Sequence, residues 1–137
     1  MELQQRIRQF YDAIIRRDSD EISAAYCTDE ATYVVLEGPR LATKGHTAIA
    51  KGWVAFCDSK IALEKIEWIE GPFEEILGES GWLSGIIKLS VAIDGKEFTN
   101  TFRASFVLKK EGETWKIRHE HVSVAHPDPY GIGDWLP

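Results

Sequence analysis

The sequence has few cysteines and no long hydrophobic run, and both absences narrow its function. Cys27 and Cys57 are its only cysteines, which are too few for a disulfide framework and wrongly spaced for a zinc site, so we expect free buried thiols. No stretch approaches the roughly 18 consecutive apolar residues of a membrane-spanning helix, and the first residues lack the apolar segment of a secretory signal. We therefore expect a cytoplasmic protein that does not act on membranes.

Basic residues are also scarce. The chain has 16 Lys and Arg against 22 Asp and Glu, a formal net charge of −6. Nucleic acids and anionic membrane surfaces both recruit basic patches, so neither is an expected partner. Glycine-rich phosphate loops and the motifs GxSxG, HExxH and CxxC are missing, which argues against nucleotide, serine-hydrolase and zinc-protease chemistry.

Apolar and aromatic residues are plentiful. Of the 137 residues 44% are hydrophobic, and five are tryptophans. At this length the chain can bury a core without disulfides or metals, and we expect one domain over 1–137 with an extended tail over 125–137. Tryptophan is large and its N–H needs a partner. Five of them indicate a deep interior, a pocket or an interface.

The first half of the chain is predicted to be mostly helical. Apolar residues recur at helical spacing between residues 3 and 15, and Asp18 with Glu21 forms a capping pattern for a second short helix. Residues 31–36 are expected to form a strand. A third helix is expected after Gly45, with Trp53 on its apolar face.

The second half is predicted to be a sheet. Strands are expected over 61–69, 82–93, 96–109 and 114–124, with turns at Gly71-Pro72, 78–81, Asp94-Gly95 and Glu111-Gly112. Long antiparallel strands twist and curl. The fold class expected is therefore α+β, a cone-shaped curved antiparallel sheet wrapped around the N-terminal helices, a cystatin-like half-barrel with space at its wide end.

Two histidines lie on one face of the last strand. His119 and His121 share that face with Trp115 and Ile117, which predicts that it points to the interior. The register of the preceding strand is open. A two-residue loop at Glu111-Gly112 would pair Arg103 with Glu120, whereas a bulged three-residue loop would bring Arg103 and Ser105 beside the histidines, and the glycine favours the latter.

Several motifs together carry a family resemblance. They are Asp29-Glu30-Ala31-Thr32-Tyr33 entering a strand, Gly45-His46-Thr47-Ala48-Ile49 opening a helix, and the ending Gly112 to Ser123 with the pattern Gly…Trp-x-Ile-x-His-x-His-x-Ser. This resembles the SnoaL-like branch of the nuclear-transport-factor-2-like superfamily, beside ketosteroid isomerase and the calcium/calmodulin-dependent kinase association domain. The resemblance implies an internal pocket and a homodimer formed through the sheet. It does not fix an activity.

The catalytic residues that the resemblance to ketosteroid isomerase implies are not present at the matching positions of this sequence. Matching the positions puts Phe10 where the isomerase's catalytic tyrosine would lie, with Tyr11 one step away, and Val35 where its general base would lie. Arg103 is present, but it has no strand aspartate beside it as the epoxide-hydrolase branch requires.

Acid/base catalysis by a histidine is what remains. His121 or His119 could move a proton next to a carbonyl, with Arg103 or Tyr33 stabilising an enolate oxygen. Trp53 and Tyr11 are expected substrate-binding residues on helices. We expect neither a cofactor nor a metal, and a small apolar or carboxylate-bearing ligand in the cone; the alternative is a non-enzymatic dimerisation module with a vestigial pocket. Trp68 and Trp82 are expected on the outer sheet face, at the dimer interface.

Overall fold

The computed structural model describes residues 2–128 and 130–133. Three helices precede four long strands, with two short strands between the second and third helices. The helices are α1 (Glu2–Arg16), α2 (Ser19–Ala24) and α3 (His46–Asp58). The strands are β1 (Tyr33–Val35), β2 (Thr43–Lys44), β3 (Ile61–Leu77), β4 (Ser80–Ile93), β5 (Lys96–Glu111) and β6 (Thr114–Ser123).

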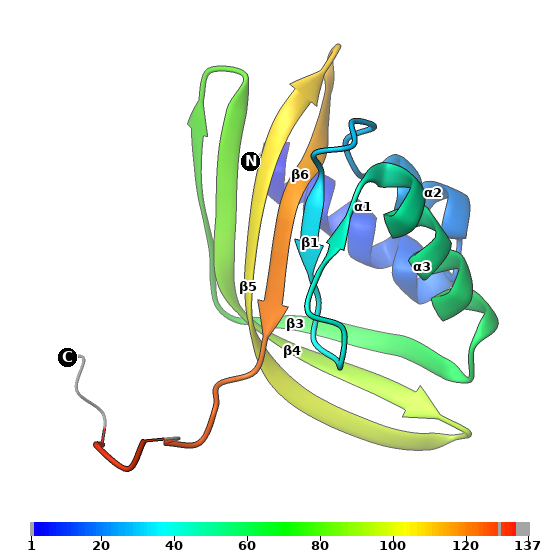
Figure 1. Ribbon diagram of the computed structural model, residues 1–137, viewed down its shortest axis with the longest axis vertical. Helices are drawn as coiled ribbons and strands as arrows, with labels where there is room; N and C mark the ends of the chain where they lie inside the picture. The colour runs from blue at the N-terminus through cyan, green and yellow to red at the C-terminus, as the bar shows by residue number, and fades with distance from the viewer. Residues whose placement is uncertain (1, 129, 134–137) are drawn as a thin grey trace.

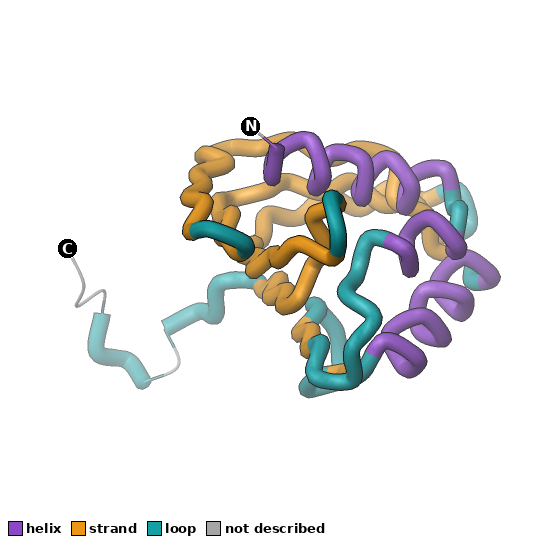
Figure 2. Tube along the Cα trace, turned by 90° about the horizontal axis from the view of Figure 1, so that it is seen from above, coloured by secondary structure: helices purple, strands orange, loops and turns teal. Residues whose placement is uncertain are grey.

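The six strands form one curved sheet, and the helices pack against its concave face. The strand order is β2-β1-β6-β5-β4-β3; among the strands of the described residues β1 and β6 are the parallel pair, and the other neighbours are antiparallel. Seen from above, the sheet bends around one side of the molecule and the helices lie across the other (Figure 2). The expected α+β cone is confirmed.

The helices follow the predicted apolar pattern. In α1 the buried side chains include Leu3, Ile7, Phe10 and Ile14. The Asp18 side chain caps α2 by accepting a hydrogen bond from the Glu21 backbone N–H at 3.1 Å, as the sequence predicts.

Strand β3 is longer than predicted. The sequence predicts a turn at Gly71 and Pro72, but β3 continues through them to Leu77. The irregularity appears instead as a shift of register between Glu70 and Phe73. A Cβ atom at Gly71 would come within 2.9 Å of the Phe73 backbone nitrogen, so the bulge needs glycine there.

A β-bulge in β6 reverses the expected face of the two histidines. Val107 pairs with His119 while Leu108 pairs with Ile117, so Arg118 is the extra residue. Up to Ile117 the odd-numbered side chains point inward; beyond the bulge Glu120 and Val122 are buried instead. The prediction that His119 and His121 face the interior is therefore wrong.

The register of β5 combines both alternatives. The loop to β6 has two residues, since Glu111 pairs with Thr114. Arg103 and Ser105 nevertheless share a face with the histidines, as the bulged loop would require. The bulge lies at Arg118 rather than in the loop, and the shared face is the outer one.

The tail leaves the barrel after β6. Its described residues from Ala125 onward are exposed and lead away from the sheet (Figure 1). These described residues do not pack against the sheet, and Trp135 and Leu136 lie outside the described residues. Within the described part of the chain, no helix is long and apolar enough to cross a membrane.

Candidate functional site

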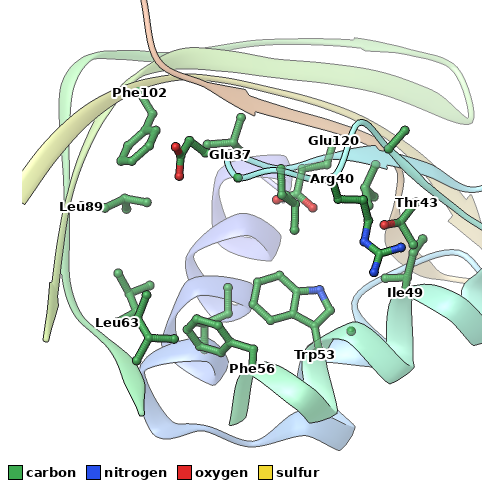
Figure 3. A pocket seen from close by; sticks show the side chains of 18 of the residues that line it. Glu37, Arg40, Thr43, Ile49, Trp53, Phe56, Leu63, Leu89, Phe102 and Glu120 are labelled. Carbon is green, nitrogen blue, oxygen red and sulfur yellow. The ribbon is translucent and has the colours of Figure 1, made fainter. Parts of the chain in front are cut away.

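A cavity of about 420 Å³ opens between α3, the hollow side of the sheet and the loop 36–42. This is within the range of small-molecule sites, roughly 300–1,000 Å³. Its wall is mostly apolar (Figure 3). The apolar side chains include those of Ile14, Val34, Leu36, Ile49, Phe56, Ile61, Leu63, Leu89, Val91, Phe102 and Val122.

One buried carboxyl group lies in this apolar wall. Glu120 projects inward from β6 and is 2% exposed. Burial raises the pKa of Glu120 from its ordinary value of 4.5 to about 7, because a charge in an apolar surrounding loses its hydration. A hydrogen bond from Tyr26 opposes this rise by stabilising the charged form. At neutral pH the carboxyl is thus divided between its acidic and basic forms, as a proton-transfer group requires.

Two further side chains orient the carboxyl. The Tyr26 hydroxyl lies 2.5 Å from Oε1 of Glu120, and the Trp53 ring N–H donates to the Tyr26 oxygen at 3.1 Å. Because a tyrosine hydroxyl has one proton and its oxygen already accepts from Trp53, that proton points at Glu120. Burial, and then the charge of Glu120, raise the pKa of Tyr26 well above 10, so it remains a donor.

Trp53, Tyr26 and Glu120 form a hydrogen-bonded relay, and packed aromatic rings hold this relay in place. The Phe10 ring meets the rings of Tyr26 and Trp53 edge-on, at centroid distances of 5.4 and 6.0 Å. Tyr11, next to Phe10 on α1, lines the cavity itself. Burial and the charge of Glu120 raise the pKa of Tyr11 well above 10, so a second protonated hydroxyl belongs to the site.

The mouth of the cavity is polar on one side and open on the other. Arg40, Glu37 and Thr43 line it from the β1–β2 connection. Gly52 lines it from α3, and a Cβ atom there would meet no other atom within 4 Å. A glycine inside a helix costs stability, roughly 0.5–1 kcal/mol against alanine, and here it leaves open space beside the cavity.

Of the predicted substrate-binding residues, Trp53 and Tyr11 lie in the cavity wall. Tyr33 does not line it, because its side chain is 42% exposed on the outer face and stacks on the His119 ring at a centroid distance of 6.1 Å.

The predicted histidines and Arg103 also lie outside the cavity. Nε2 of His121 is 3.1 Å from the Ser123 hydroxyl, and Nδ1 of His119 is 2.8 Å from the Tyr33 carbonyl oxygen. Arg103 donates to the Ser123 hydroxyl and to the Val124 carbonyl. These side chains are brought together, but on the convex face of the sheet.

Glu120 is the residue that the sequence analysis missed. Strict alternation from Trp115 along the strand predicts that Glu120 faces solvent. The available signal was Val122, an apolar residue out of phase with Ile117, which indicates that the strand changes face between them.

A family model described as a SnoaL-like domain matches residues 3–127, and the chain belongs to this family. A search of the curated proteins found no match.

Solved structures share the fold at low sequence identity. A nuclear transport factor 2-like superfamily protein from Salmonella enterica serovar Typhimurium superimposes with a TM-score of 0.79 at 19% identity, over 97% of this chain and 95% of that one. A ketosteroid isomerase-like protein from Erwinia carotovora atroseptica gives 0.74 at 12% identity, over 92% and 95%. A Xanthomonas campestris protein assigned to the calcium/calmodulin-dependent protein kinase II association domains gives 0.74 at 17% identity, over 93% and 87%.

Proposed function

We propose that the protein binds a small apolar carbonyl compound in the cavity and moves a proton on it without a cofactor, in a reaction of the isomerase, cyclase or dehydratase type. The observation that carries this is the Glu120 carboxyl, buried in an apolar cavity and held by Tyr26. Glu120 replaces the histidines as the acid/base group. A similar structure from Streptomyces avermitilis, at 14% identity, is described as a dehydratase of this superfamily.

The proton transfer needs no outside reactant. The Glu120 carboxylate accepts a proton from the carbon next to the substrate carbonyl, and the carbon–hydrogen electron pair moves to form an enolate. The neutral carboxyl then returns the proton to the same carbon or to another position of the conjugated system. The hydroxyl of Tyr11, also in the cavity wall, is the donor that we assign to the developing enolate oxygen.

Hydrogen–deuterium exchange tests this step before the natural substrate is known. We expect the protein in D2O to exchange the α-hydrogens of some members of a panel of apolar ketones and keto acids, followed by proton NMR. Glu120→Gln should slow the exchange by about 100-fold or more, the usual contribution of a general base. The rate should rise with pH up to about 7, as Glu120 loses its proton.

The matched control is Glu113→Gln, which neutralises an exposed carboxylate in the turn before β6. It should exchange like the parent protein. Equal exchange by Glu120→Gln and the parent would contradict the assignment, and panel members that bind without exchanging would leave only the binding function.

A second copy of the chain is the partner that we propose for the outer sheet face. Trp82, Val107, His119 and Tyr33 are register neighbours in a row across four strands on that face. Trp82 and Val107 are each 39% exposed, and Phe73 nearby is 55% exposed. Such an apolar surface is typical of an interface. The association-domain assignment of the Xanthomonas protein also supports assembly. Trp68 does not contribute, because it packs inward on Gly85.

Charge in the centre of this row should separate the subunits. We expect the parent protein to have the mass of a dimer in size-exclusion chromatography with light scattering, and Trp82→Glu combined with Val107→Glu to have that of a monomer. Val54→Glu on α3, also an exposed apolar residue at 46%, is the control and should remain dimeric. A monomeric parent, or a double variant of unchanged mass, would overturn the proposal.

A further inference from the structure

The cavity also indicates which kind of molecule it binds. We infer that the ligand is an apolar organic acid whose carboxylate pairs with Arg40 at the mouth while its apolar body lies along Leu63, Leu89 and Phe102. This inference rests on the proposed function, since it concerns the same cavity. It adds a charge and an orientation to the ligand.

Arg40 has the position and the free donors for this role. Among the described residues that line the cavity it is the one cation. Its guanidinium lies beside Thr43 and near Ile49, at one side of the cavity (Figure 3). It forms no ion pair within residues 2–128 and 130–133, whereas Arg16 and Arg118 both have acidic partners. A guanidinium presents a planar set of N–H donors that matches a carboxylate.

The loop that carries Arg40 is fixed at both ends. Val34 pairs with Thr43 and Tyr33 with Lys44, so β1 and β2 close the loop 36–42 at its base. The Gly45 N–H then donates to the Thr32 carbonyl at 2.7 Å. Arg40 is therefore presented from a connection whose base is held by backbone hydrogen bonds.

The charges in the wall select one orientation for an anion. In Figure 3 the carboxylate of Glu37 lies on the side of Phe102, and the guanidinium of Arg40 lies on the opposite side, near Ile49. An anionic group is repelled at the first place and attracted at the second. The long apolar wall between Leu63 and Phe102 then receives the rest of the molecule, which passes Glu120 on the way.

A matched pair of fluorescent probes tests the charge requirement. Anilinonaphthalene sulfonate is anionic, and N-phenyl-1-naphthylamine has the same aromatic body without the charge. We expect the parent protein to bind the sulfonate several-fold more tightly than the neutral amine, and more so at low salt. Arg40→Gln should abolish this preference, weakening the sulfonate by about tenfold while leaving the amine unchanged.

Three controls locate the effect. Arg40→Lys should keep part of the preference, and Arg8→Gln, which removes an exposed cation on α1, should keep all of it. Gly52→Leu places a side chain in the mouth, where a Cβ meets no neighbouring atom, and should weaken both probes together.

The outcomes distinguish a failure of the proposed acid ligand from a failure of the proposed binding function of the cavity. Binding of both probes with equal affinity, or an unchanged preference in Arg40→Gln, would overturn the assignment of an acid and leave the apolar cavity standing. Binding that Gly52→Leu does not weaken would overturn both, since the probes would then lie outside the cavity.

Discussion

Glu120→Gln should make the protein more stable above neutral pH. The pKa of Glu120 is raised from 4.5 to about 7 in the folded chain, so between these values the folded state binds a proton that the unfolded state releases. Stability therefore falls as pH rises from about 4.5 through 7. With about 1.4 kcal/mol for each pH unit, the parent should lose roughly 2–3 kcal/mol between pH 5 and pH 8 from this group.

The variant has no carboxyl to titrate, and its amide oxygen can still accept the Tyr26 hydroxyl. Urea unfolding at pH 5 and pH 8, followed by tryptophan fluorescence, measures the difference. Glu113→Gln should follow the parent, because that side chain is exposed. If the parent and Glu120→Gln lost equal stability over this range, Glu120 would have an ordinary pKa and no special fitness for proton transfer.

Phe10→Ala should cost about 3–5 kcal/mol of unfolding free energy, the usual loss for a buried phenylalanine. Phe10 is fully buried, and its ring contacts those of Tyr11, Tyr26, Trp53 and Phe106. The cavity left behind would release Tyr26 and Trp53, which orient Glu120. Urea unfolding at pH 6 gives the loss of stability.

Gln9→Ala is the matched control for this prediction, since Gln9 is the preceding, exposed residue of α1. Its effect should be within about 0.5 kcal/mol, as for most surface substitutions. A loss below about 1 kcal/mol in Phe10→Ala would mean that the surrounding rings close the gap, and that the relay does not depend on this packing.

Local chemistry predicted most of the fold. Asp94 and Gly95 have φ values of 51° and 79°, which is the left-handed pair that a tight hairpin needs, and Ile93 pairs with Lys96 as the Asp-Gly signal predicts. The helix cap at Asp18 depends on residues three positions apart. Such signals can be found because the physical cause and the structure lie within a few residues of each other.

The face of Glu120 could not be predicted in the same way. Up to Ile117, the free edge of β6 is bonded to residues 25–27, with Cys27 donating to the Ile117 carbonyl and the Ile117 N–H donating to Ala25. From His119 onward that edge pairs with β1. The bulge at Arg118 lies where the strand changes its neighbour. Its cause is thus a segment some 90 residues earlier in the sequence, and the signal near Arg118 is limited to Val122, which is out of phase with Ile117.

Because of the bulge at Arg118, residues 119–123 contribute alternately to the cavity and to the outer face of the sheet. Beyond it, Glu120 and Val122 face the cavity, while His119, His121 and Ser123 face outward. Substitutions at alternate positions therefore alter either the chemistry or the surface that meets other molecules, but not both. A family that keeps this strand can change what its cavity admits without altering its outer sheet face, and can change that face without altering its cavity.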